Sequence, residues 1–355
     1  MKENLLPPPD RTRPYLVLGG GAIGGTLAHA LACAGHPVTV VDSDVAHVRA
    51  IEECGLVIER EASSERAPRI RAYTPDEADR LGLRFRRVLL ATKSQHTTQA
   101  AEWLASHLDE GGFVISCQNG ENVVLIDRAL GQGTAVTSFV NLFADIVGPG
   151  RIRDGGQGAF AIGESDGRLS QRVLESVADL RAWGPVVATA NVKGYLWSKH
   201  IFAEMLSVSA LVDASMADAV DLRRDAFLAV GREVFSIAAK QQIPLERFDA
   251  FRPEAFGPGA SVEMRESCLD SLTAWLRTMP KQRSGVWTDI MVRGRRTEAH
   301  EDLRALASIA AEHGIPTPLL GWLDAALSEL EEGTRRPSVS NLDELAELAI
   351  VKQTV

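Results

Sequence analysis

Three glycines at fixed spacing, Gly19, Gly21 and Gly24, follow the apolar run 15–18 and precede a segment of small residues that predicts a helix. Between a strand and a helix, the first glycine permits a tight turn, the second lets the backbone approach a pyrophosphate, and the third lets the helix pack closely. The helix N-terminus adds N–H donors and a partial positive charge. The alternative is a glycine turn that only joins two packed elements. We expect a phosphate cradle made of Gly19, Gly21, Ala22, Ile23 and Gly24.

An acid follows the β-branched run 38–41, which predicts the second strand. Asp42 lies 23 residues after Gly19, close to the spacing of about 20 residues at which an acid binds the adenosine ribose of NAD. A carboxylate there accepts bonds from both ribose hydroxyls and repels a 2′-phosphate. The other interpretation is that Asp42 and Asp44 cap the next helix. We expect NAD(H) to be favoured over NADP(H).

Two later residues could move a proton. Lys199 lies in the segment LWSK and Glu298 in GRRTE. When a hydride reaches a ketone carbon, the oxygen becomes negative and needs a proton donor, which a lysine ammonium can be. Apolar neighbours would lower the pKa of that lysine, and a nearby carboxylate would raise it. Taken singly, Lys199 could equally be a surface lysine and Glu298 a solvated helix carboxylate.

The order of predicted elements indicates the fold. Apolar runs alternate with helical patterns from residue 15 to about 190, which is typical of an α/β doubly wound parallel sheet, a Rossmann domain. Residues 1–14 are rich in proline and predict a loose arm. Residues 191–355 predict an all-α domain for substrate binding and dimerisation, with helices over 194–212, 218–240, 261–276, 303–312, 319–330 and 342–351.

Composition excludes several partners. With 38 Lys and Arg against 47 Asp and Glu, the net charge is −9, so no bulk positive field exists for nucleic acid. No apolar run approaches the ~18 residues of a membrane span, and the first residues lack an apolar signal core. We expect a cytoplasmic protein with four free cysteines. His200 and Glu204 are too few to make a metal site, so no metal is expected.

Four short segments add to the glycine motif: ATKSQ (91–95), CQNG (117–120), LWSK (196–199) and GRRTE (294–298). In this order they resemble the ketopantoate reductase (2-dehydropantoate 2-reductase) family from Tyr15 to about Glu332. The resemblance implies a Rossmann domain, a helical domain, a keto acid or ketone substrate and a homodimer as one possible assembly. It also implies that Lys199 is the general acid, that Glu298 binds the reacting hydroxyl and holds the lysine, that Asn119 lies beside nicotinamide and substrate, and that Lys93 lies near the cofactor.

Several positions depart from the family pattern. Asparagines expected after the lysine are replaced by Ala203, Ser207 and Ala217, and a second serine expected after Ser284 is Gly285. Lost polar partners argue for a different substrate. We therefore expect a reductase of a less polar 2-oxo acid or ketone, whose substrate contacts come from Asn119, Ser207, Ser284 and Glu298. Ketopantoate reductase itself, a D-2-hydroxyacid dehydrogenase and a dinucleotide-binding sensor without turnover remain alternatives.

The only basic cluster contains Arg293, Arg295 and Arg296. Such a group could grip a substrate carboxylate or a cofactor phosphate. A solvated turn is the interpretation that we favour.

Overall fold

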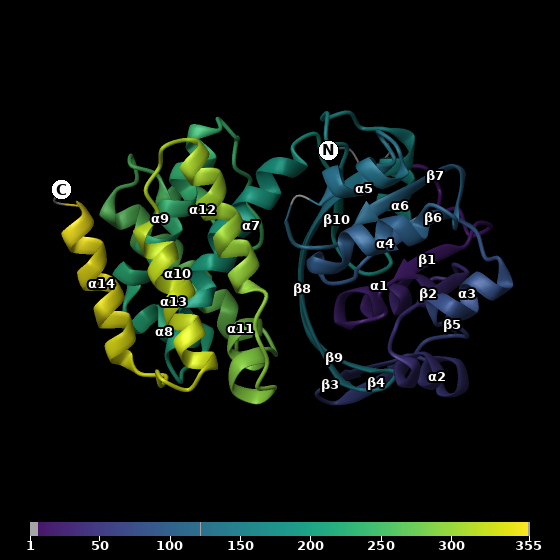
Figure 1. The fold of residues 1–355 in the computed structure, drawn as a ribbon, viewed down its shortest axis with the longest axis horizontal. Coiled ribbons are helices and arrows are strands. Elements are labelled where there is room, and N and C mark those ends of the chain that lie inside the picture. Colours follow the sequence, from purple (N-terminus) through teal and green to yellow (C-terminus); the bar gives the residue numbers. More distant parts are fainter. Residues whose placement is uncertain (1–5, 121, 354–355) are drawn as a thin grey trace. The chain divides into compact units, whose positions relative to one another are not determined.

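The chain divides into two units with separate cores, Met1–Val192 and Lys193–Val355. A computed structural model describes residues 6–120 and 122–353 (Figure 1). Residues 1–5 of the expected arm and residues 354–355 of the expected helical domain lie outside the described residues.

The first unit contains one sheet of ten strands. They are β1 (Tyr15–Leu18), β2 (Val38–Val41), β3 (Val57–Arg60), β4 (Ser63–Arg66), β5 (Arg71–Tyr73), β6 (Phe85–Leu90), β7 (Leu108–Ser116), β8 (Ala135–Gly148), β9 (Arg151–Gly163) and β10 (Val186–Ala188). Its helices are α1 (Ala22–Cys33), α2 (Val45–Cys54), α3 (Pro75–Leu81), α4 (Thr97–Leu104), α5 (Val123–Leu130) and α6 (Gln171–Leu180).

Strand order determines where a ligand can bind. Parallel pairing places β5, β2, β1, β6, β7 and β8 side by side in that order, which is the order of the doubly wound dinucleotide fold. The order in which the strands are added reverses between β1 and β6. Strands β2 and β5 extend the sheet on one side of β1, and β6, β7 and β8 extend it on the other. In such sheets the ligand crevice lies outside the carboxyl ends of the strands at this switch point. The glycine motif follows β1, and Lys93 follows β6.

Side chains of β1 alternate between two cores, so both faces of the sheet are covered. Tyr15 and Val17 join the core that contains Leu27 of α1, whereas Leu16 and Leu18 join the core that contains Leu104 of α4. A strand that is buried on both faces must be apolar throughout. This requirement explains why the run 15–18 has no charged residue, and why its one hydroxyl, on Tyr15, has a hydrogen-bond partner.

The sheet is larger than the parallel sheet that the sequence predicts. The long hairpin β8–β9 is antiparallel, and β3, β4 and β10 extend the sheet beyond it. Strand β4 has the sequence SSER and is exposed at all four positions, so it has no apolar alternation from which it could be predicted. Its pairing with β3 defines it instead.

Residues 10–13 of the arm are held in place, contrary to the expected loose arm. The N–H of Asp10 donates to Asp179 at 3.1 Å, and the buried Arg87 donates to the carbonyls of Asp10 and Arg13. Asp179 also accepts from Tyr15 Oη at 2.9 Å and from Arg87 Nη1 at 2.7 Å. A buried carboxylate is thereby paired with a buried guanidinium.

The second unit is helical. Its helices are α7 (Val192–Ser207), α8 (Met216–Leu222), α9 (Arg224–Lys240), α10 (Val262–Thr278), α11 (Gly285–Trp287), α12 (Ala299–Glu312), α13 (Pro318–Glu331) and α14 (Val339–Gln353). The single helix predicted over 218–240 is wrong, because the chain leaves helical geometry at Arg223. The side chain of Arg223 pairs there with Asp225 and Asp343. The helix predicted to begin at Leu303 begins earlier, so that Glu298 is the N-cap of α12.

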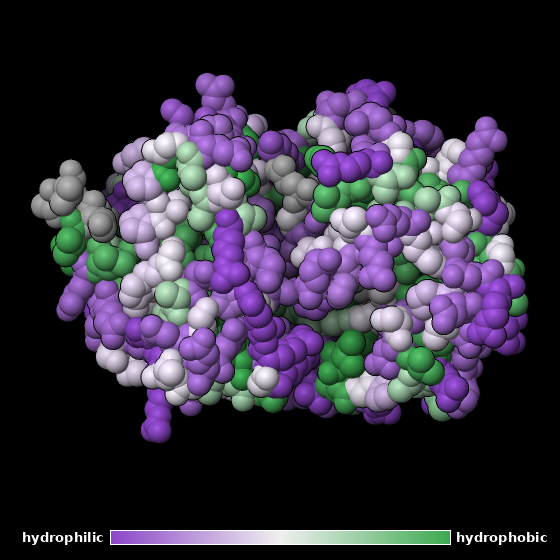
Figure 2. All heavy atoms as spheres, viewed as in Figure 1, coloured by the Kyte–Doolittle hydropathy of each residue, from purple (hydrophilic) through white to green (hydrophobic). Residues whose placement is uncertain are grey.

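No helix among residues 6–120 and 122–353 is long and apolar enough to cross a membrane. On the face shown in Figure 2, hydrophilic side chains cover most of the surface and hydrophobic ones gather in smaller groups.

The buried Arg87–Asp179 pair yields a stability prediction. Arg87→Ala leaves a buried carboxylate without its main counter-charge, so the free energy of unfolding should fall by about 3–5 kcal/mol. Urea denaturation measures the change. Arg168 pairs with Asp166 on the surface, and Arg168→Ala should cost less than about 1 kcal/mol. Equal losses in the two variants would contradict the account.

Candidate active site

Two of the three motif glycines are required by close packing. Gly19 has φ +95°, and a Cβ there would lie 2.7 Å from the backbone nitrogen of Thr92 in the loop after β6. A Cβ on Gly24 would lie 1.9 Å from the carbonyl oxygen of Gly19. A Cβ on Gly21 would meet only Ile146 Cδ1, at 3.8 Å. Gly21 therefore faces open space beside the N-terminus of α1, where a phosphate could approach the backbone.

Gly20, which lies between Gly19 and Gly21, is held through both its N–H and its carbonyl. The N–H of Gly20 donates to Asp42 Oδ2 at 2.7 Å, and its carbonyl lies 2.9 Å from His47 Nε2. The N–H of Gly150 lies 3.0 Å from His47 Nδ1. Because an N–H can only donate, Nδ1 accepts and Nε2 carries the proton that Gly20 accepts. The C=O and N–H of a trans peptide point in opposite directions, so this bond turns the Gly21 N–H away from His47.

Asp42 braces the loop and does not cap α2. Its Oδ1 accepts from the N–H of Asp44 at 2.9 Å, while Asp44 alone caps α2 through the N–H groups of Ala46 and His47. Oδ1 of Asp42 thus accepts from the N–H of Asp44 and Oδ2 accepts from the N–H of Gly20, and each oxygen has a second lone pair. The carboxylate can thus also accept from ribose hydroxyls.

Lys93 and Asn119 lie at the carboxyl ends of β6 and β7, at the same edge of the sheet as the glycine loop. Leu18, Leu90 and Ser116 are in register across β1, β6 and β7. The buried Gln118 donates to the carbonyl of Thr92 at 3.1 Å and accepts from Thr97 Oγ1 at 3.2 Å. Gln118 therefore holds the Lys93 loop against the Asn119 loop.

Lys199 lies on α7 of the second unit, in a stretch of the helix where Leu196, Trp197 and Ile201 are buried. Although the side chain keeps some exposed area, loss of hydration lowers its pKa from 10.5 to about 8. The charge of Asp302 opposes this shift. Lys199 in turn helps burial to lower the pKa of His200 to about 4. The structure thus contains a lysine tuned toward neutral pH.

Glu298 is positioned by α13. The N–H of Thr297 donates to Glu331 Oε1 at 2.8 Å. Two residues after Glu298, the ring of the buried His300 contacts Asp324 through Nδ1, and its Nε2 lies 3.1 Å from Glu331 Oε2. These contacts fix the backbone on both sides of Glu298 at the start of α12.

The two predicted substrate-binding serines have local partners. Ser207 Oγ donates to the carbonyl of Ala203 at 3.0 Å, one turn earlier on α7. Ser284 Oγ accepts from the N–H of Trp287 at 3.2 Å and caps α11. Both hydroxyls therefore support their own helices.

The basic cluster is largely neutralised. Arg293 and Arg295 both donate to Asp289 Oδ1, from 2.9 Å, and Arg296 lies 3.9 Å from Glu301. This pairing favours a structural turn over a grip on a ligand.

Sequence reasoning missed His47 and Asp302. His47 lies four residues before the buried Ile51 on α2, so helical periodicity could have placed it on the buried face. Asp302 lies four residues after Glu298, and no motif marks it.

Comparison with known proteins identifies the family of the chain. Residues 15–167 match the model of the family described as ketopantoate reductase PanE/ApbA, and residues 191–331 match the model of its C-terminal part. A 2-dehydropantoate 2-reductase of Mesorhizobium japonicum is 30% identical over 207 residues, which are 52% of this chain and 62% of that protein. The match thus spans less than two thirds of that curated relative.

Solved structures share the fold. A PanE/ApbA family ketopantoate reductase from Ralstonia eutropha has a TM-score of 0.71 at 25% identity, covering 90% of this chain and 99% of that one. D-mandelate dehydrogenase with NADH and anilino(oxo)acetate has a TM-score of 0.75 at 17% identity, with the same coverage. Together the two family matches extend over most of the sequence, and the chain belongs to the ketopantoate reductase family.

Proposed function

We propose that the chain reduces a 2-oxo acid or a related ketone with NADH, and that Lys199 protonates the oxygen of the reacting carbonyl. The observation that carries this proposal is the lysine itself, whose burial on α7 lowers its pKa to about 8. An acid with a pKa near the working pH is largely protonated and is still acidic enough to transfer its proton to the substrate.

The first unit has the features that a dinucleotide needs. Gly21 leaves room at the N-terminus of α1, the Gly20 peptide is fixed by Asp42 and His47, and Asp42 keeps lone pairs for the ribose. NADH would supply the hydride. Asp42 would bind the adenosine ribose, and Lys93 and Asn119 would contact the cofactor from the ends of β6 and β7.

In the second unit, Lys199 would donate its Nζ proton as negative charge develops on the substrate oxygen. Asp302 favours the ammonium form and thereby keeps the proton available before reduction. Glu298 would accept a hydrogen bond from the hydroxyl that forms. By family resemblance Asn119, Ser207 and Ser284 would complete the substrate contacts, although the two serines already have local partners.

A sensor that binds NADH without turnover is the alternative from another class. The replaced asparagines favour the sensor. The lowered pKa of Lys199 favours the enzyme, because strongly shifted pKa values are typical of groups that transfer protons in active sites. Steady NADH oxidation with any 2-oxo acid excludes the sensor.

Lys199→Ala should reduce kcat by about 10²–10⁴-fold, the usual contribution of a positioned proton donor. The Kd for NADH should change little, because Lys199 would act on the substrate oxygen and not on the adenosine end of the cofactor. Lys240→Ala, at an exposed position at the end of α9, serves as the control and should keep wild-type kcat. An alanine variant at position 199 with near wild-type kcat would move the proton donor elsewhere.

Cofactor choice can be tested with two variants that act on different parts of NADH. Wild-type protein should bind NADH more tightly than NADPH. Asp42→Asn keeps an oxygen for the Gly20 N–H but loses the charge, so it should weaken NADH binding by about tenfold and narrow the preference. His47→Ala removes the contact that holds the Gly20 carbonyl, so it should weaken the binding of NADH and of NADPH by the same factor. Nicotinamide fluorescence measures the four Kd changes, and tighter wild-type binding of NADPH would refute the ribose role.

The substrate should be less polar than ketopantoate. Three positions expected to be polar have no polar side chain: Ala203, Ala217 and Gly285. The hydroxyl of Ser207 already donates its hydrogen bond to the carbonyl of Ala203. Each lost partner for a substrate hydroxyl costs about 1–3 kcal/mol. The fold also occurs in D-mandelate dehydrogenase, so the comparison includes phenylglyoxylate and branched 2-oxo acids. These should exceed ketopantoate in kcat/KM, and a preference for ketopantoate above about tenfold would contradict the prediction.

A further inference from the structure

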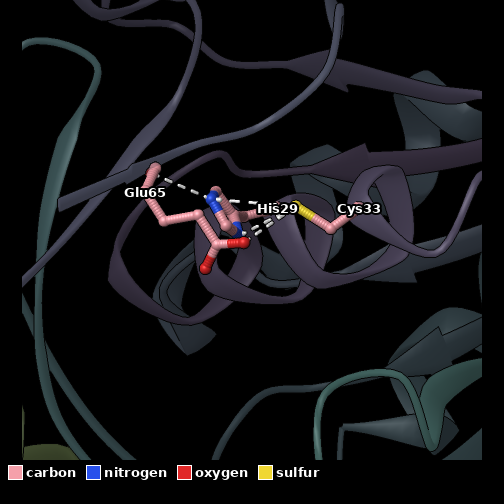
Figure 3. A group of neighbouring side chains, drawn as sticks. All are labelled: His29, Cys33 and Glu65. Carbon is pink, nitrogen blue, oxygen red and sulfur yellow. Dashed lines mark hydrogen bonds between the residues drawn. The ribbon is translucent and has the colours of Figure 1, made fainter.

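Three possible metal ligands meet on the first unit, apart from the proposed catalytic residues. His29 and Cys33 are one turn apart on α1, and Glu65 is on the edge strand β4 (Figure 3). One nitrogen, one sulfur and one carboxylate oxygen of these residues lie within 4.8 Å of one another. We call this group the α1–β4 cluster.

The ring of His29 is oriented as in a metal site. Nε2 lies 3.0 Å from the backbone carbonyl of Glu65. A carbonyl can only accept, so Nε2 carries the proton and Nδ1 presents its lone pair. Metal-bound histidines commonly donate their second N–H to a carbonyl in this way, which fixes the tautomer. Glu65 would thus orient the ring through its backbone and bind the ion through its side chain.

The separations suit a tetrahedral ion. Cys33 Sγ lies 3.7 Å from His29 Nδ1 and 3.8 Å from Glu65 Oε1. Bond lengths of about 2.3 Å to sulfur and about 2.0–2.1 Å to nitrogen or oxygen place a tetrahedral sulfur ligand about 3.5–3.6 Å from each of the other two ligands. Sγ is also 4.0 Å from Nε2, so the thiol lies beside the ring. Binding requires Cys33, an exposed residue at the end of α1, to turn its sulfur toward the Nδ1 lone pair.

The carboxylate of Glu65 is oriented by its neighbours. The thiol of Cys33 donates to Glu65 Oε1 at 3.8 Å. Arg60 holds the other oxygen of Glu65 at 3.2 Å, which leaves Oε1 facing the cluster.

We propose that the α1–β4 cluster binds Zn²⁺ through His29 Nδ1, Cys33 Sγ and Glu65 Oε1, with water in the fourth position. A mixed nitrogen, sulfur and oxygen donor set matches this borderline-soft ion. On binding, the S–H bond of Cys33 breaks, an S–Zn bond forms, and the proton passes to solvent. The ion ties the edge strand β4 to α1, the helix whose N-terminus carries the phosphate cradle.

Cobalt substitution tests the site on the whole, tag-free chain after dialysis against a chelator. Co²⁺ should produce a saturable thiolate-to-cobalt charge-transfer band, and one equivalent of Zn²⁺ per chain should abolish it. Cys33→Ser should remove the band, and His29→Ala or Glu65→Gln should weaken binding by more than about tenfold.

Cys54→Ser is the matched control, since Cys54 is also free and exposed but ends a different helix. It should keep the band and the wild-type affinity. Circular dichroism verifies that each variant is folded. A wild-type protein without a saturable band, or a Cys33→Ser variant that retains it, would overturn the proposal.

Discussion

The peptide that links Gly20 to Gly21 is the constraint on which the first unit depends. Its carbonyl is held by His47, and the N–H of Gly20 is held by Asp42. The flanking Gly19 and Gly24 allow β1, α1 and the loop after β6 to approach at distances that no Cβ tolerates. Helix α2, which supplies His47, and the β8–β9 hairpin, which supplies Gly150, both serve to hold this one turn in place.

The second unit depends on a balance of charge. Burial weakens the ammonium form of Lys199, and the charge of Asp302 limits this loss. Burial acts in the opposite direction on the carboxyl of Glu204, whose pKa is raised well above its usual range, in part by the charge of Asp302. Burial thus weakens the charged form of both side chains on α7. The second unit thus supplies the proton and the first unit binds the cofactor in the proposed reaction.

Local patterns predicted a large part of this arrangement. The glycine spacing, the β-branched strand before Asp42 and the cap at Asp44 are short-range signals, and the structure places those elements accordingly. The α/β first unit and the helical second unit also followed from periodicity. What the sequence could not predict depends on distant partners: exposed β4 pairs with β3, and residues 10–13 are held where Arg87 donates to the carbonyls of Asp10 and Arg13.

Among the site residues, the same division holds. Gly19 and Gly24 can be recognised from their spacing, because the turn and the close packing demand glycine there. Periodicity could place His47 on the buried face of its helix, but not its contact with Gly20, and no motif marks Asp302. The break at Arg223 is a further example, since the same residue pairs with Asp343, more than a hundred residues away.

The most direct test of the account is the pH dependence of kcat/KM for the best 2-oxo acid at saturating NADH, measured between about pH 6 and 10. If protonated Lys199 donates to the reacting oxygen, kcat/KM should be constant at low pH and should fall about tenfold per unit above its pKa of about 8. A value of kcat/KM that stays constant or rises through this range would contradict Lys199 as the proton donor.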